Sequence, residues 1–205
     1  MKNTIGIFDS GIGGLTVANA ITRRLSKESL IYFGDTAHLP YGDKSEDLIK
    51  YFSLSIANFL IETKECKAVV IACNTASAVA YEHLRDKHQG SIPIINVIDP
   101  IIEAIVKDDK IFKVGLIATQ TTINSKVYQE KLQRRNPTLQ VEVLATPLLA
   151  PMIEEGYAND NISQAVIENY LKNPKFKDID ALILGCTHYV LIKDEISDYF
   201  DGKVK

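Results

Sequence analysis

Two cysteines in this 205-residue chain each end an apolar run and enter a polar turn. Cys73 follows the run 68–72, and Cys186 follows the run 181–185. The two turns read Cys73-Asn74-Thr75 and Cys186-Thr187-His188. If each run is a strand that leads into a helix, the sulfur lies near a helix N-terminus, where the helix dipole favours the thiolate. The pattern therefore predicts two reactive thiols, whereas Cys66 lacks this context and is interpreted as a structural residue.

Two thiols suit a reaction that inverts a carbon stereocentre by proton transfer. One base removes the proton from one face of the carbon, and an acid returns a proton to the opposite face. The reference pKa of a thiol is about 8.5, so the thiol and the thiolate are both accessible at neutral pH. In the resting protein one cysteine must be a thiolate and the other a thiol. Asp9, Glu154 and His188 are the candidates for ionisable groups that tune them.

The elements that must position these residues alternate between short apolar runs and longer amphipathic stretches. The expected strands cover residues 4–8, 30–34, 68–72, 93–98, 112–118, 139–145 and 181–184, and the expected helices cover residues 15–25, 47–63, 76–88, 123–135 and 162–173. The strands are continuously apolar, which is typical of strands that are covered on both faces. Such an alternation predicts parallel sheets, with ligands bound beyond the carboxyl ends of the strands.

A weak internal repeat divides the chain into two similar halves. The matched segments are residues 5–10 with 114–119, and residues 68–73 with 181–186. A residue before proline is pushed out of the helical conformation, so we place the break at Asp99-Pro100. The predicted fold class is α/β, with two similar domains over residues 1–98 and 99–205. Each domain is expected to be a mostly parallel sheet flanked by helices, with the active site in the cleft between the domains.

Composition and charge argue against several classes of function. Hydrophobic residues make up 46% of the chain and charged residues 24%, which are ordinary values for a globular protein. The net charge of −3 offers no basic field to a nucleic-acid backbone. No apolar run approaches the roughly 20 residues that span a bilayer, and the glycine-rich start is not typical of a signal peptide. We therefore expect a cytoplasmic protein that binds neither nucleic acid nor membranes.

Metal and nucleotide sites are not expected either. The three cysteines are an odd and sparse set, which argues against a disulfide framework. Neither a CxxC nor an HxxxH spacing is present, which argues against structural zinc. Segment 9–14 is rich in glycine, but Thr16 stands where a GxGxxG motif needs glycine, and there is no GK[ST] sequence. We expect these glycines to let the turn approach a small carboxylate. His83 and His88 are interpreted as solvated residues of a charged helix.

Five motifs give the chain a resemblance to a known family. They are IGIFDSGIGGLTV (5–17), YFGDTAHLPYG (32–42), IACNTASA (71–78), PMIEEG (151–156) and LGCTHYVL (184–191). Together they resemble the motif series of bacterial glutamate racemases, in the family's order and over nearly the whole chain. The resemblance implies two α/β domains with the active site between them, neither pyridoxal phosphate nor a metal as cofactor, and production of D-glutamate for peptidoglycan.

The matched motifs also imply roles for individual residues. Cys73 would act on the α-proton of D-glutamate, with Asp9 beside it as an assisting acid/base. Cys186 would act on the α-proton of L-glutamate, with support from Glu154 and His188. The residues implied to hold the amino and carboxylate groups of the substrate are Ser10, Pro40, Tyr41, Gly42, Asn74, Thr75, Thr119, Thr122 and Thr187. Because members of the family often form homodimers, we expect a homodimer here as well.

Three positions qualify the resemblance. Aspartate racemases of the same superfamily tend to carry Glu where His188 stands, so this chain's histidine favours glutamate as the substrate. His38 stands where many members of the family have Arg, and we assign it no role. The family continues past Lys205 with a strand-associated turn and a helix that packs onto the first domain. The resemblance therefore implies a chain that is shortened at its C-terminus.

Other functions stay open on the residues alone. An aspartate racemase or a decarboxylase of this superfamily would use the same two-thiol cleft on another small acid. A shortened protein that binds a carboxylate, without turnover, would keep the same motifs. A thiol hydrolase would pair Cys73 with His188, but this function leaves the second cysteine without a role.

Overall fold

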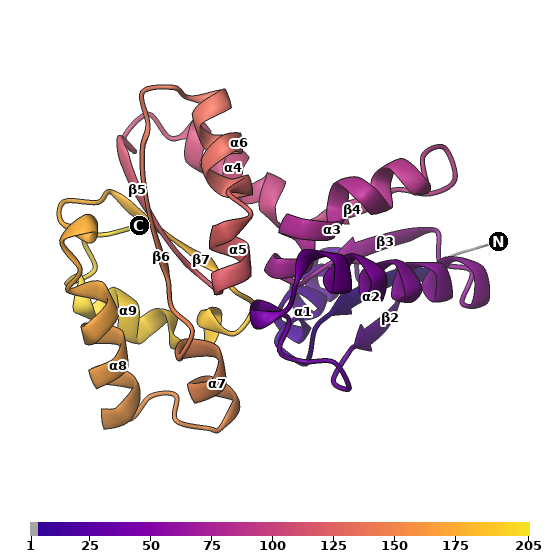
Figure 1. The fold of residues 1–205 in the computed structure, drawn as a ribbon, viewed down its shortest axis with the longest axis horizontal. Coiled ribbons are helices and arrows are strands. Elements are labelled where there is room, and N and C mark those ends of the chain that lie inside the picture. Colours follow the sequence, from indigo (N-terminus) through magenta and orange to yellow (C-terminus); the bar gives the residue numbers. More distant parts are fainter. Residues whose placement is uncertain (1–3) are drawn as a thin grey trace. The chain divides into compact units, whose positions relative to one another are not determined.

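The computed structural model describes residues 4–205, and the chain divides into two compact units, Met1–Ile98 and Asp99–Lys205. Each unit contains one sheet, every strand pair in it is parallel, and helices flank the sheet (Figure 1). The predicted α/β fold with two parallel sheets is therefore confirmed. In residues 4–205, no helix combines the length and the apolar character that crossing a membrane requires.

The first unit is built on a sheet with the strand order β2-β1-β3-β4. Its strands are β1 (Thr4–Asp9), β2 (Ser29–Gly34), β3 (Ala68–Ile71) and β4 (Ile94–Asn96). Its helices are α1 (Leu15–Arg24), η1 (Tyr41–Asp43), α2 (Glu46–Asn58), η2 (Phe59–Thr63) and α3 (Asn74–Lys87). Residues of α2, η2 and α3 pack with Phe8 and Ile71 in the larger core cluster of this unit. The central strands are buried because their residues are apolar on both faces, as the sequence predicts.

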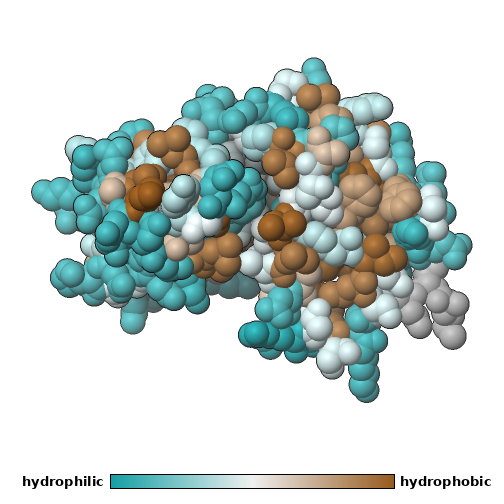
Figure 2. All heavy atoms as spheres, turned by 90° about the horizontal axis from the view of Figure 1, so that it is seen from below, coloured by the Kyte–Doolittle hydropathy of each residue, from teal (hydrophilic) through white to brown (hydrophobic). Residues whose placement is uncertain are grey.

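Helix α1 covers its part of the first unit only thinly. No residue of this ten-residue helix is buried, and Leu15 keeps 50% of its surface exposed. Val17 and Ile21 are half-buried against Ile7 and Val70 of the sheet. Figure 2 shows hydrophobic side chains gathered on one face of this unit, on the right of the view. The thin cover that α1 provides therefore leaves part of the apolar surface of this unit exposed.

The second unit is built on a sheet with the strand order β6-β5-β7. Its strands are β5 (Lys113–Ala118), β6 (Gln140–Ala145) and β7 (Ala181–Gly185). Its helices are α4 (Ile98–Lys107), α5 (Gln120–Asn124), α6 (Val127–Arg135), α7 (Leu149–Glu154), α8 (Asn161–Leu171), η3 (Pro174–Phe176), η4 (Tyr189–Ile192) and α9 (Lys193–Tyr199). The core cluster of this unit includes Ile117, Met152, Ile167 and Ile196, which come from β5, α7, α8 and α9. The same layered arrangement of a sheet and its helices therefore occurs twice in the chain.

The internal repeat is reproduced residue for residue in the strand pairing. Ile5 pairs with Ala68 between β1 and β3, and Val114 pairs with Ala181 between β5 and β7. These are the positions that the repeat aligns with each other. The strand orders β2-β1-β3 and β6-β5-β7 also match when the two halves are compared. The repeat therefore reflects two similar folding units.

Two helix predictions fail, for reasons that lie in the local backbone. The segment 123–135 is predicted as one helix, but Lys126 adopts a left-handed conformation (φ 57°) that separates α5 from α6. Ser125 favours this break, because its hydroxyl donates to Thr122 O at 2.7 Å and competes with the helix backbone. Asp99 is predicted outside helices because a proline follows it, yet Asp99 and Pro100 are the second and third residues of α4. Proline is tolerated there because the first N–H groups of a helix have no partner within the helix.

The interpretation of His88 as a solvated residue is wrong, although His83 of the same helix is exposed. His88 keeps only 9% of its surface and caps the C-terminal end of α3. Its Nε2 has no hydrogen-bond partner in residues 4–205. Burial, and secondarily the charge of Lys87, lower the pKa of His88, while Glu62 opposes the shift. The imidazole is therefore held neutral in the folded chain.

We expect the free energy of unfolding to fall as the pH drops below about 6.5, the pKa of an unperturbed histidine. The pKa of His88 is lower in the folded than in the unfolded chain, so acid protonates the unfolded state first and favours it. Urea unfolding at about pH 7.5 and about pH 5.5 measures the loss. His88→Gln should reduce the loss, and His83→Gln on the same helix should leave it unchanged. An equal loss in wild type and His88→Gln would contradict this prediction.

Candidate active site

The carboxyl edge of the first sheet brings together residues from three strands. Asp9 ends β1, Asp35 directly follows β2, and Cys73 lies two residues beyond β3. Asp35 N donates to Asp9 O at 3.0 Å, and Ala72 N donates to Phe8 O at 2.8 Å, so the pairing continues past the strands. Carboxyl ends of parallel strands share one edge of the sheet. The predicted residues of this half therefore lie beside one another.

Cys73 is the N-cap residue of α3. Its Sγ accepts a hydrogen bond from Ala76 N at 3.4 Å and lies 3.6 Å from Ser10 Oγ. Burial, and secondarily the negative charge of Asp9, raise the pKa of Cys73 to about 11. The hydrogen bonds from Ala76 and Ser10 oppose this rise without cancelling it. In the absence of substrate Cys73 is therefore a thiol at neutral pH.

Asp9 is fully buried and is held by the glycine-rich turn that follows it. Its Oδ2 accepts hydrogen bonds from Gly11 N and Gly14 N, both at 3.1 Å. A Cβ atom on Gly14 would lie 2.6 Å from Asp9 Cβ and 2.9 Å from Tyr32 Oη, so only glycine fits. The turn is predicted to approach a small carboxylate, and the carboxylate that these two N–H groups bind is the side chain of Asp9 itself.

The turn around Tyr41 is tied to Asp35, a residue that the sequence analysis missed. Tyr41 Oη donates to Asp35 Oδ2 at 2.6 Å, and His38 Nδ1 lies 2.8 Å from Asp35 Oδ1. Burial, and secondarily the hydrogen bond to Asp35, raise the pKa of Tyr41 far above its ordinary value. Pro40 follows a cis peptide bond, and Gly42 is buried in η1. The position of Asp35 directly after a predicted strand is the signal that could have identified it.

In the second unit, Cys186, His188 and Glu154 form a continuous row. Cys186 directly follows β7, and its Sγ lies 3.6 Å from His188 Nδ1. His188 Nε2 lies 2.9 Å from Oε1 of Glu154, the last residue of α7, although it forms no hydrogen bond within residues 4–205. Cys186 and His188 are both buried. This arrangement connects the sulfur, through an imidazole, to a carboxylate that is partly exposed to solvent.

The predicted threonine and asparagine residues cluster at helix starts beside the two cysteines. Thr119 is the N-cap of α5, where its Oγ1 accepts from Thr122 N at 3.4 Å and lies 3.0 Å from Thr122 Oγ1. The pairing of Ala118 with Gly185 places Thr119 and Cys186 at neighbouring positions of the sheet edge. The buried predicted residues of this kind are Asn74, Thr75, Thr122 and Thr187.

Each unit therefore assembles its own part of the predicted site. Asp9, Ser10 and Cys73 adjoin in the first unit, and Cys186, His188 and Glu154 adjoin in the second. Further buried residues that the sequence analysis missed are Tyr128, Thr146 and Tyr189. Burial, and secondarily the charge of Cys186, raise the pKa of both tyrosines. Among residues 4–205, no group of three or more His, Cys, Asp or Glu side chains is arranged to hold a metal ion.

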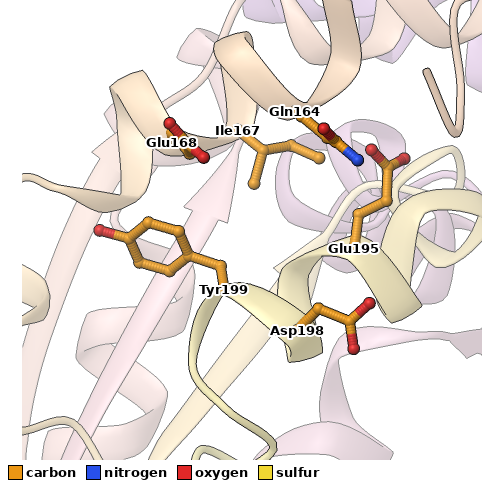
Figure 3. Close-up of a pocket in the computed structure, with 6 residues that line it drawn as sticks. All are labelled: Gln164, Ile167, Glu168, Glu195, Asp198 and Tyr199. Atoms are coloured by element: carbon orange, nitrogen blue, oxygen red, sulfur yellow. The ribbon is translucent and has the colours of Figure 1, made fainter. Parts of the chain in front are cut away.

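A groove of about 250 Å³ between α8 and α9 lies apart from these residues. Figure 3 shows the carboxylates of Glu168, Glu195 and Asp198 around it, with Tyr199 and Gln164. Glu195 already accepts hydrogen bonds from the residues at the start of α8. None of the predicted site residues lines this groove, and Glu195 connects α9 to the start of α8.

The family model for Asp/Glu/Hydantoin racemases matches residues 5–205. The chain belongs to this family. It is 46% identical over 192 residues to a glutamate racemase of Neisseria meningitidis serogroup B, covering 94% of this chain and 70% of that protein. It is also 46% identical over 195 residues to the glutamate racemase of Aquifex pyrophilus, covering 95% and 74% of the two chains. The resemblance stated from the motifs is thereby confirmed.

Solved structures of this racemase family have the same fold. A glutamate racemase of Francisella tularensis in complex with D-glutamate superimposes with a TM-score of 0.92 at 42% identity, over 100% of this chain and 75% of that one. The glutamate racemase of Aquifex pyrophilus gives a TM-score of 0.82 at 45% identity, over 98% and 77%. An aspartate racemase of Picrophilus torridus, 16% identical with a TM-score of 0.69, shares the fold alone.

We expect Asp9→Asn to lower the pKa of Cys73 from about 11, because the substitution removes the negative charge that opposes the thiolate. Burial of the sulfur persists, so the pKa should stay above the usual thiol value. The measurement is the rate of alkylation by iodoacetamide as a function of pH, followed by mass spectrometry on the peptide that contains Cys73. Asp47→Asn, on the exposed side of α2, is the matched control. An unchanged or raised pKa in Asp9→Asn would contradict the assigned cause.

Proposed function

We propose that this chain is a glutamate racemase that interconverts L- and D-glutamate without a cofactor, with Cys73 and Cys186 as the two acid/base residues. The observation that carries the proposal is the placement of one thiol after equivalent strands of two similar sheets, in a chain 46% identical to glutamate racemases. Each thiol has a different set of polar neighbours, which suits two different protonation states. The requirement of a two-base inversion is one thiol and one thiolate.

The two environments favour opposite resting states. The raised pKa of Cys73 keeps it protonated. Cys186 Sγ lies 3.6 Å from His188 Nδ1, and a hydrogen bond donated by this ring nitrogen would stabilise the thiolate. The proposed resting protein is therefore a Cys186 thiolate with a Cys73 thiol, the state that accepts L-glutamate.

Proton transfer then proceeds in two balanced steps. The Cys186 thiolate takes the α-proton of L-glutamate, and the Cys73 thiol gives its proton to the opposite face of the carbon. The protein is left with a Cys186 thiol and a Cys73 thiolate, which is the state that D-glutamate requires in the reverse direction. Asp9 assists Cys73, while His188 and Glu154 carry a proton between Cys186 and solvent. Exchange with solvent restores the starting state.

We propose that hydroxyl and backbone N–H groups hold the substrate so that its α-hydrogen points at a sulfur. Asn74 and Thr75 begin α3, where the helix N-terminus attracts a carboxylate. The other proposed substrate-binding residues are Ser10, Pro40, Tyr41, Gly42, Thr119, Thr122 and Thr187. The product would supply peptidoglycan synthesis. The cytoplasmic location and the homodimer stay predictions.

Aspartate is a weaker candidate for the substrate. An aspartate racemase structure and the structure of an aspartate racemase homologue are 16% and 21% identical to this chain, against 42% for the glutamate racemase bound to D-glutamate. His188, rather than Glu, also stands beside Cys186. Glutamate is therefore the substrate that we propose, and a preference for aspartate in substrate profiling would contradict it.

We expect the wild-type protein to abolish the circular dichroism of an L-glutamate solution as it forms the racemate. Cys73→Ala and Cys186→Ala should each stop this loss, because either change removes one of the two proton carriers. Cys66→Ala is the matched control, since Cys66 is equally buried but lies beneath Gly6, away from the sheet edge. This variant should retain activity. Racemisation by either of the first two variants at the wild-type rate would contradict the two-thiol mechanism.

We expect Glu154→Gln to lower kcat by about tenfold or more, because the neutral amide cannot exchange a proton with His188 at a distance of 2.9 Å. Glu155→Gln changes the next residue of the same turn and should leave kcat near the wild-type value. The two variants are compared by polarimetry with saturating L-glutamate. Equal rates for both variants would remove Glu154 from the mechanism.

A further inference from the structure

A buried tyrosine joins three strand ends at the carboxyl edge of the second sheet. Tyr189 is fully buried, its Oη lies 2.8 Å from Thr146 Oγ1, and it donates to Thr146 O at 3.1 Å. Thr146 Oγ1 donates in turn to Ala118 O at 3.3 Å, and Thr146 N donates to the same carbonyl at 2.9 Å. Tyr189 therefore ties the turn after β7 to the ends of β5 and β6.

Both ends of this chain of hydrogen bonds adjoin proposed site residues. Tyr189 directly follows His188, and its N donates to Cys186 O at 3.2 Å. Ala118, at the other end, directly precedes Thr119. The aromatic ring lies in the core cluster that also contains Cys186. Loss of the tyrosine hydroxyl would therefore first alter the conformation of the turn that contains Cys186 and His188.

The first unit also contains a buried tyrosine that is bonded to the residue after its edge strand, but this tyrosine lies in the turn after β2 and not after the strand that leads to the cysteine. Tyr41 Oη donates to Asp35 at 2.6 Å, and Asp35 N donates to Asp9 O at 3.0 Å. Position 9 corresponds to position 118 in the internal repeat, so Asp35 and Thr146 occupy equivalent places after their edge strands. In each unit a buried tyrosine is thus anchored to the residue that follows the edge strand.

We propose that Tyr189 is a positioning residue, whose hydroxyl acts through Thr146 to hold Cys186 Sγ and His188 Nδ1 within 3.6 Å. This proposal rests on the proposed racemase function. In this proposal Tyr189 neither contacts the substrate nor transfers a proton. Loss of its hydroxyl lets the turn relax, so proton transfer at Cys186 slows while proton transfer at Cys73 does not.

Four variants of the full chain test the proposal. Tyr189→Phe removes the hydroxyl and keeps the ring, while Thr146→Val removes the side-chain hydroxyl that contacts Tyr189 Oη, at nearly constant volume. Thr146→Ser keeps this hydroxyl and should stay near wild type. Ile196→Val trims a buried side chain of α9 and controls for a general loss of stability in this unit. Circular dichroism and thermal unfolding establish that each variant is folded.

The deciding measurement is the deuterium isotope effect on kcat/KM with L-[2-²H]glutamate and with D-[2-²H]glutamate. We expect kcat to fall about tenfold in Tyr189→Phe. In Thr146→Val the fall should be about threefold, because the tyrosine hydroxyl can still bond to the backbone carbonyl of residue 146. KM should stay within about twofold of the wild-type value in both variants. Because removal of the L-proton becomes more rate-limiting, the isotope effect should rise for the L-enantiomer and fall for the D-enantiomer. A loss of folded protein lowers both rates equally and leaves the two isotope effects unchanged, as expected for Ile196→Val.

The outcomes separate this proposal from the function on which it rests. Wild-type protein that does not exchange the α-proton of either enantiomer in D₂O would contradict the proposed function, and this proposal with it. An active wild type with unchanged isotope effects in a folded Tyr189→Phe would overturn the positioning role alone. If Tyr189→Phe does not fold, the same two isotope effects measured on Thr146→Val decide the question. Failure of Thr146→Ser to retain activity would also overturn the proposal.

Discussion

The parallel pairing of the central strands is the constraint on which both halves of the candidate site depend. Ile5 opposite Ala68 and Val114 opposite Ala181 set the register of the two sheets. A slip by one residue would turn every side chain of a strand to the other face and move the residues that follow it. The register is fixed because the strands are apolar and buried on both faces. Packing in the interior therefore determines where the polar edge residues end up.

Both cysteines are buried, but the charged and polar groups beside them differ. Cys73 is surrounded by apolar core and by the carboxylate of Asp9, and both disfavour its thiolate. Cys186 is nearly as buried, but it adjoins the imidazole of His188, whose other nitrogen faces Glu154. Similar sheets thus carry dissimilar electrostatics at equivalent positions. A reaction that needs one acid and one base can therefore use two cysteines, because their different neighbours favour different protonation states.

Much of the fold could be predicted, because apolar runs and glycine-rich turns report directly on buried parallel strands. The motifs likewise pointed to Cys73 and Cys186. The missed residues belong to contacts across long sequence distances, such as Thr146 with Tyr189, 43 residues apart. A threonine after a strand looks the same in the sequence whether or not a tyrosine reaches it. The burial of His88 cannot be read from the sequence, because the residues that directly precede it, Arg85, Asp86 and Lys87, are charged and exposed.

The depth at which the cysteine sulfurs lie also bears on the durability of the protein. Oxidation of cysteine to sulfenic acid and beyond begins with an accessible thiolate. Cys73 keeps 5% of its surface exposed and Cys186 8%, and Cys73 is mostly protonated at neutral pH. Peroxide therefore has little access to either sulfur, and Cys73 is in addition in its less reactive thiol form. The same desolvation that keeps Cys73 in its protonated thiol form therefore also gives it resistance to oxidative damage.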